Sequence, residues 1–247
     1  MLCPSSNRYP YRHFGSHHRA PQTLSQKPAT VWKQLKTLNR SAALIVVDVQ
    51  IGFDDPSWGA RNNPQAETRI AQLLETWRES AAPVIHVHHH STSANGSFRP
   101  GMRGSEPKPE ARPRGDEPVY KKYVNSAFIG TDLEADLHRR GIHTVVIVGL
   151  STNHCISTTV RMAGNLGFET YVVADATATF DRAGADGRLR PAEEVHNAAL
   201  GDLQEEFAEV IDTAAVIGAL TRIGTGSMTS RASSSDIGED RPTHPRE

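Results

Sequence analysis

Three residues of types that catalyse covalent chemistry lie in separate segments of this chain. Cys155 follows the β-branched run Val145–Val148 and the turn Gly149–Asn153. Asp48 stands near the end of a second apolar run, and Lys122 lies in a more polar segment. A thiol can attack a carbonyl carbon, a carboxylate can take the proton of the thiol, and an ammonium group can stabilise the resulting charge. The three residue types therefore predict a reaction with a cysteine nucleophile.

The position of Cys155 strengthens this interpretation. The run before it can be apolar throughout only as a buried parallel strand, and Thr152 or Asn153 is expected to cap the helix that follows. Ligands of α/β folds bind beyond the carboxyl ends of strands, and free N–H groups at a helix start favour a thiolate. We therefore expect a thiol with a lowered pKa. The alternative is a buried cysteine that serves only as a small hydrophobic residue.

The elements that must position these residues alternate between strands and helices. The expected strands are 43–49, 83–88, 145–148, 169–173 and 210–211. The expected helices are 64–80, 131–140, 155–166, 191–207 and 213–220. Thr131 and Glu134 have the spacing of a capping box for the second of these helices. Such alternation predicts an open parallel sheet with right-handed crossovers.

Two loops interrupt the pattern, at 91–119 and 175–190. The first is rich in proline and glycine, and a loop of this length is expected to cover a site. Arg99 and Arg103 lie in it and are either contacts for an anionic substrate or solvated charges.

Four histidines, His86, His88, His89 and His90, lie at the end of the second expected strand. His86 and His88 would point to one face of that strand, as zinc ligands can. No nearby cysteine or aspartate completes a tetrahedral set, so we expect no metal, although these two residues keep the alternative open. No Gly-x-Gly-x-x-Gly follows a strand either, and we expect no cofactor.

Composition limits the partners of the chain. With 247 residues, 37% hydrophobic, and a net charge of −1, it can form one sizeable domain whose partner is a small molecule, with neither nucleic acid nor membrane. Cys3 and Cys155 are its only cysteines, which favours a reducing, cytoplasmic location. Residues 1–39 are basic and contain no Asp or Glu, so they read as a disordered extension, with a mitochondrial transit peptide as the alternative. Residues 223–247 are expected to form a disordered tail.

Between these ends, residues 40–222 resemble the isochorismatase-like cysteine hydrolases, a family that includes nicotinamidases, N-carbamoylsarcosine amidases and streptothricin hydrolase. The resemblance rests on four motifs in the family's order: Leu44–Phe53, Lys122–Phe128, Gly149–Thr159 and Gly167–Ala176. It implies a three-layer α/β/α fold around an open, six-stranded, mostly parallel sheet. We also expect a homo-oligomer.

The resemblance implies a role for each reactive residue. Asp48 would be the general base, Lys122 the cation that orients it, and Cys155 the nucleophile. A cis peptide between Leu150 and Ser151 would direct the Ser151 N–H, with that of Cys155, at an oxyanion. The implied reaction is hydrolysis of an amide or lactam C–N bond of a small molecule through a thioester.

The chain departs from the nicotinamidase pattern, since His88–His90 lacks the aspartate of that metal motif. Seven residues near the three motifs are expected to contact substrate: Gln50, Phe53, Trp58, Asn125, Phe128, Thr152 and His154. Trp58 and Phe128 can equally be core residues. The competing function is a ligand-binding or oligomeric module that keeps the fold without catalysis.

Overall fold

A computed structural model describes residue 35 and residues 37–226, with side chains as far as Leu220. Most of the expected N-terminal extension and of the C-terminal tail lies outside these residues. Leu35 and Leu38 pack in the core, and the Leu38 N–H donates to the Ala219 carbonyl at 3.3 Å. These two residues therefore belong to the core although they precede the expected boundary at residue 40.

The centre of the described part is one six-stranded sheet. Its strands are β1 (Ala43–Val47), β2 (Val84–His89), β3 (Val119–Lys122), β4 (Thr144–Leu150), β5 (Glu169–Ala178) and β8 (Glu209–Ile211). Their order is β3-β2-β1-β4-β5-β8, and each neighbouring pair is parallel. This confirms the predicted parallel sheet.

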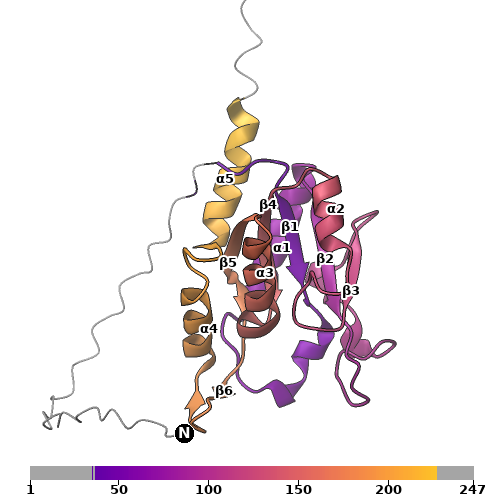
Figure 1. Ribbon diagram of the computed structural model, residues 1–247, viewed down its shortest axis with the longest axis vertical. Coiled ribbons are helices and arrows are strands. Elements are labelled where there is room, and N and C mark those ends of the chain that lie inside the picture. Colours follow the sequence, from indigo (N-terminus) through magenta and orange to yellow (C-terminus); the bar gives the residue numbers. More distant parts are fainter. Residues whose placement is uncertain (1–34, 36, 227–247) are drawn as a thin grey trace, which may run out of the picture. The chain divides into compact units, whose positions relative to one another are not determined.

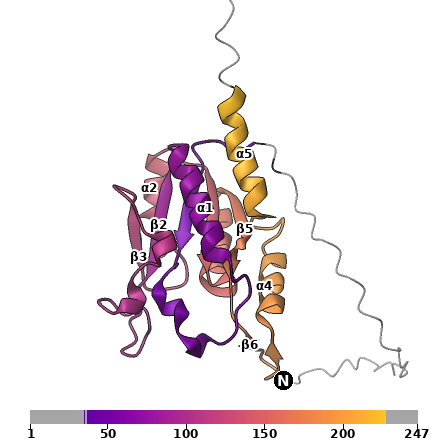
Figure 2. The same ribbon diagram turned by 180° about the vertical axis from the view of Figure 1, so that it is seen from behind.

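Helices cover both faces of the sheet (Figures 1 and 2). On one side lie α1 (Ala66–Glu79) and α5 (Thr213–Gly226). On the other side lie α2 (Leu133–Arg139), α3 (Ser157–Asn165) and α4 (Ala192–Gly201). Because side chains alternate along a strand, β1 sends Leu44 and Val46 into the first core and Ile45 and Val47 into the second. This is the expected three-layer α/β/α fold. None of the described helices is long and apolar enough to cross a membrane.

Three element boundaries differ from the prediction. Strand β3 falls where a loop and a polar segment were expected, because only Lys122 of its four residues is buried. Strand β5 continues past residue 173 through a register shift, where the Asn63 amide donates to the carbonyls of Ala174 and Thr177 at 2.9 and 2.7 Å. Helix α4 ends at Gly201 rather than near 207, because the chain turns back at Glu205, whose φ is 68°.

Two smaller features were also predicted differently. The segment after β5 forms a hairpin of β6 (Arg182–Ala183) and β7 (Leu189–Arg190) instead of a plain loop. At the start of α2 the Leu133 N–H donates to Thr131 Oγ1 at 3.4 Å, but the N-cap position is Asp132, and no side chain caps it. The predicted capping box is therefore wrong.

The loop between β2 and β3 is packed rather than structureless. It holds two short 3-10 turns, Arg103–Ser105 and Pro109–Ala111. Lys108, which is buried, donates to Glu67 Oε1 at 2.7 Å and also bonds to Asp54. The loop also presses on the segment after β1, where a Cβ on Gly52 would lie 2.7 Å from the ring of Phe98. The side of the loop that faces β1 is thus fixed by buried contacts.

Candidate active site

Asp48, Lys122 and Cys155 meet at the carboxyl edge of the sheet. Asp48 directly follows β1, Lys122 ends β3, and Cys155 follows β4. Strands β1 and β4 approach so closely here that a Cβ on Gly149 would lie 1.9 Å from the Val47 carbonyl oxygen. The backbone of Asp48 has φ 54°, a left-handed conformation that is costly for a residue with a side chain and typical of functional sites.

The Lys122 ammonium group lies at the centre of the cluster. Its Nζ donates to Asp48 Oδ2 at 2.6 Å, to the Val124 carbonyl at 3.1 Å and to Cys155 Sγ at 3.3 Å. The side chains of Lys122 and Asp48 are 0% and 1% exposed. Separating such a buried ion pair would leave an uncompensated charge in the interior, so the fold holds these groups in one arrangement.

Cys155 lies within a π-helical turn, Thr152–Ile156, that leads directly into α3. The Ile156 N–H donates to the Ser151 carbonyl at 3.2 Å. The N-cap position is Ser151, and no side chain caps the turn, so the expected cap by Thr152 or Asn153 is wrong. The peptide bond between Leu150 and Ser151 is cis. A π-turn is rare and is often found at functional sites.

The thiol is protonated in this arrangement. Burial and, to a smaller extent, the Asp48 carboxylate raise the pKa of Cys155 to about 12, although Lys122 opposes both. The expected lowering of the thiol pKa at a helix start is therefore wrong, because desolvation outweighs the nearby cation. Burial likewise raises the pKa of Asp48, despite the charge of Lys122.

Asp48 has one carboxylate oxygen available for chemistry. Oδ2 bonds to Lys122, whereas Oδ1 is buried and lacks a hydrogen-bond partner. A buried carboxylate oxygen without a hydrogen bond is energetically unfavourable, and a catalytic role is one reason why a protein keeps such a group. Its raised pKa also makes Asp48 a better proton acceptor than an exposed aspartate. The geometry therefore fits a general base beside a thiol.

His89 joins this cluster and was not singled out from the sequence. The Lys122 ammonium donates to His89 Nδ1 at 3.3 Å. Burial, together with the charges of Lys122 and His90, lowers the pKa of His89 to about 4. The group of four histidines was the only feature of the sequence that pointed to a histidine here. It does not show which of the four side chains lies against Asp48, Lys122 and Cys155.

The histidines considered as zinc ligands are placed differently. His86 is buried and donates from Nε2 to Glu117 Oε2 at 2.9 Å, so it serves an ion-pair network with Arg78. Among the described residues, the group whose atoms lie close enough to hold a metal ion is Asp48, His89 and Cys155. The Lys122 ammonium bonds to all three of these groups.

Asn125 borders this cluster, and three other predicted site residues line a small hollow whose walls do not include Asp48, Lys122 or Cys155. Asn125 Oδ1 lies 3.8 Å from Cys155 Sγ. Trp58, Ser151 and His154 line a small hollow of about 60 Å³, together with residues from the segment Thr179–Arg182. The sequence analysis did not identify Phe180 and Arg182 of that segment, which lies in the expected loop at 175–190.

The other predicted wall residues have structural contacts. Both amide hydrogens of Gln50 donate to carbonyls, of His89 at 3.0 Å and Ser105 at 2.9 Å, and Gln50 Oε1 accepts from the His89 N–H. Thr152 bonds to His196 on α4. Phe128 stacks on Phe168 within the second core, 6.0 Å between centroids.

Phe53 belongs to an aromatic cluster that joins the segment after β1 to two distant parts of the chain. Its ring lies 5.2 Å from Trp58, 4.8 Å from Phe98 and 5.8 Å from Phe180, between centroids. Trp58 also donates from Nε1 to the Gly52 carbonyl at 2.8 Å. Phe53 is buried, while Trp58 is partly exposed and faces the hollow.

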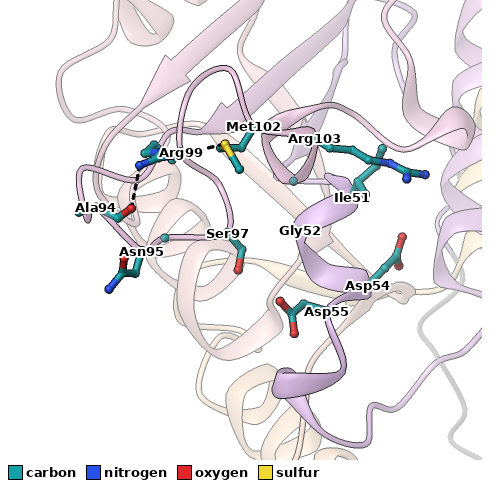
Figure 3. Close-up of a pocket in the computed structure, with 12 residues that line it drawn as sticks. Ile51, Gly52, Asp54, Asp55, Ala94, Asn95, Ser97, Arg99, Met102 and Arg103 are labelled. Atoms are coloured by element: carbon teal, nitrogen blue, oxygen red, sulfur yellow. Dashed lines mark hydrogen bonds between the residues drawn. The ribbon is translucent and has the colours of Figure 1, made fainter.

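Arg99 and Arg103 line a different cavity, of about 540 Å³, between the β2–β3 loop and the segment after β1 (Figure 3). Arg99 donates to the Ala94 carbonyl at 2.9 Å and to the sulfur of Met102 at 3.3 Å. Neither Asp48 nor Cys155 lines this cavity. The two arginines are therefore not placed at the cluster of reactive residues.

Comparison with known proteins gives a consistent result. Residues 42–215 match the family described as "Isochorismatase domain". The chain is 46% identical over 176 residues to the uncharacterized isochorismatase family protein YrdC of Bacillus subtilis, covering 71% of this chain and 94% of that protein. A crystal structure of an isochorismatase-family protein from Chromobacterium violaceum is 43% identical, with a TM-score of 0.75, and the match covers 78% of this chain and 100% of that one. Maleamate amidohydrolase of Pseudomonas putida is 29% identical over 197 residues, covering 73% of this chain and 87% of that enzyme.

Proposed function

This chain belongs to the isochorismatase family of hydrolases, and from that premise we propose that it hydrolyses a C–N bond of a small amide or lactam through a thioester on Cys155. The observation that carries the proposal is the buried cluster in which Lys122 bonds both Asp48 and Cys155. A purely structural core would gain more from apolar side chains at these positions, because buried charges are costly to desolvate.

The first step is a proton transfer from Cys155 to Asp48. It leaves the total charge of the pair unchanged, so the desolvation that raises the pKa values of both groups largely cancels in the transfer. Lys122 has three N–H donors for four acceptors: Asp48, His89, the Val124 carbonyl and the sulfur. Once Asp48 is protonated, its carboxyl group accepts a weaker hydrogen bond from Lys122. The Lys122 ammonium can then donate more strongly to the Cys155 thiolate.

The second step is attack of the thiolate on the amide carbonyl carbon. A C–S bond forms, the carbonyl electron pair moves to oxygen, and the backbone N–H groups of Ser151 and Cys155 receive that oxyanion. Asp48 then returns its proton to the nitrogen, the C–N bond breaks, and an amine or ammonia leaves.

In the hydrolysis of the thioester, Asp48 again acts first as the base and then as the acid. Asp48, again a carboxylate, takes a proton from water, and the hydroxide attacks the thioester carbonyl. The C–S bond breaks, the sulfur recovers the proton from Asp48, and a carboxylic acid leaves. No metal or cofactor is needed for any step of this scheme.

We infer the substrate class from the walls of the hollow that Ser151, the proposed oxyanion donor, helps to line. Trp58 faces the hollow beside Ser151 and His154, and Phe180 stacks on Trp58, 5.4 Å between centroids. Aromatic walls gain most from flat faces, and Asn125 can orient a carbonyl or amide group. We propose a compact, planar or cyclic amide. Maleamate, the substrate named for the relative from Pseudomonas putida, is a small planar amide with a carboxylate, and it belongs in the first panel tested.

The test is substitution of the nucleophile. Neutral cyclic amides, carbamoyl amino acids, ureido acids and maleamate are screened for release of ammonia or amine, and Cys155→Ala is then compared with wild type. We expect turnover to vanish while the far-UV circular dichroism spectrum stays unchanged. Turnover that persists in Cys155→Ala would exclude the covalent mechanism.

The alternative is a binding or oligomeric module without catalysis. A module would bind members of the panel, release no product, and accumulate no acyl adduct on Cys155 by mass spectrometry. The expected homo-oligomer stays a prediction under either function.

A further inference from the structure

His196 is a buried side chain on α4 that has no part in the proposed reaction, yet it bonds to the turn that carries Cys155. It is 4% exposed, and its Nδ1 lies 2.9 Å from Oγ1 of Thr152, which is 0% exposed. Burial lowers the pKa of His196, so the imidazole is neutral at neutral pH. Within a dry interior such a hydrogen bond has no competing water and holds its geometry firmly.

The turn needs support from outside, because its own end is uncapped. Ser151 at the N-cap makes no side-chain capping bond. The Ile156 N–H reaches back five residues to the Ser151 carbonyl, a bond that is longer in sequence than in an α-helix. One external support is the Thr179 hydroxyl, which donates to Asn153 Oδ1 at 2.6 Å. The other is His196, acting on Thr152.

We propose that His196 is a positioning residue, which holds Thr152 and thereby fixes the direction of the adjoining Ser151 N–H toward the oxyanion. Thr152 is joined to Ser151 by one peptide unit, so a shift of Thr152 moves the Ser151 Cα and, with it, the Ser151 N–H. Among the described residues, the hydrogen bond of His196 goes to Thr152 and not to the Asp48 carboxylate or the Cys155 thiol, so we expect its removal to leave the ionisation of the thiol unchanged. The proposal rests on the function assigned above to Cys155.

Two reagents distinguish an effect on the oxyanion site from an effect on the ionisation of the thiol. Both are used in a Cys3→Ser background, where Cys155 is the single thiol. With p-nitrophenyl acetate, the sulfur bonds to the carbonyl carbon through an oxyanion, p-nitrophenolate leaves with the electron pair, and the thiol proton passes to Asp48. With iodoacetamide, the sulfur displaces iodide from a saturated carbon, and no oxyanion forms. The first reaction needs the Ser151 amide in place, while the second needs only the thiolate.

We expect His196→Leu to lower the acylation rate by about 10-fold or more, since a small misplacement of catalytic groups is costly. The rate of alkylation and its pH profile should match those of the Cys3→Ser parent. His196→Asn restores a polar group near the position of Nδ1 and should recover much of the acylation. Thr152→Val should behave like His196→Leu, and the double variant should be no slower than either, because both remove one bond.

Leu200→Ala is the matched control, since Leu200 is buried one turn further along the same face of α4. It should lower the melting temperature without changing the ratio of acylation to alkylation. If Leu200→Ala lowers that ratio as His196→Leu does, or if alkylation falls together with acylation in His196→Leu, the positioning role is overturned. Alkylation without acylation in the parent also overturns it, because the turn would then form no oxyanion site. If the parent reacts with neither reagent, the proposed function itself fails.

Discussion

The Lys122 ammonium donates a hydrogen bond to Nδ1 of His89 at 3.3 Å. An ammonium group has no lone pair, so Nδ1 must accept, and the hydrogen of the neutral imidazole must lie on Nε2. The arrangement determines both the charge and the tautomer of a histidine beside the thiol.

We predict that His89 stays neutral across the working pH range. Burial and the charge of Lys122 lower its pKa to about 4, so protonation occurs only in acid. Nitrogen-15 NMR of histidine-labelled protein, assigned with His89→Gln, should show an unprotonated Nδ1 at neutral pH. A His89 signal that titrates near the ordinary value of 6.5 would contradict this arrangement.

The pH dependence of turnover should report Asp48. The reaction needs its carboxylate form, and burial raises the pKa of Asp48 above its ordinary value of 3.8. We therefore expect kcat/KM to be lost as pH falls through this raised pKa, while circular dichroism shows folded protein. Asp48→Asn should remove turnover at every pH. A flat acid side down to the ordinary aspartate pKa would argue against Asp48 as the base.

Lys122→Met should be both inactive and unstable. It leaves the Asp48 carboxylate buried without its counter-charge, which costs about 3–5 kcal/mol of unfolding free energy in comparable pairs. Urea denaturation measures the loss. Adding Asp48→Asn removes the unpaired charge, so the double variant should regain stability but not activity. Equal stability of Lys122→Met and wild type would refute the buried ion pair.

Acid unfolding should depend on Glu67, which links α1 to the β2–β3 loop. Although burial raises the pKa of Glu67, hydrogen bonds from Arg61 and Lys108 outweigh it and lower the pKa to about 2. A lowered pKa stabilises the fold above the ordinary value of 4.5, and this contribution is lost as pH falls from there toward 2. Its size is at most about 3 kcal/mol. Glu67→Gln should therefore lower stability at neutral pH and flatten the acid dependence, as measured by urea midpoints at several pH values.

Activity should survive exhaustive chelation. Asp48, His89 and Cys155 could together hold a metal ion, but each of them bonds to the Lys122 ammonium. Metal analysis of the purified protein provides the check, and stoichiometric zinc or iron would reverse this view. Lys122→Ala is the informative variant, since loss of the ammonium should allow zinc to bind.

The features that could be predicted from the sequence are those that depend on long apolar runs. The buried strands before Asp48 and Cys155 are continuous apolar segments, so their shared edge could be placed. Strand β3 could not be predicted, because it is a short edge strand with one buried residue, Lys122.

Roles that depend on tertiary contacts were also beyond the sequence. Nothing local shows that the Gln50 amide is occupied by backbone groups of distant segments. The raised pKa of Cys155 could not be predicted either, because desolvation depends on packing from several elements. His89 lies between two other histidines, His88 and His90, and only the fold shows which of the three side chains contacts Lys122.

The anchoring of the β2–β3 loop has a kinetic consequence. Buried bonds hold the loop from two sides, at Lys108 with Glu67 and at Ser105 with Gln50. A segment held in this way is a fixed wall, and opening it would break several buried polar contacts at once. Substrate and product then exchange without a large loop movement, so turnover should be limited by bond making and breaking and should be insensitive to the viscosity of the solvent.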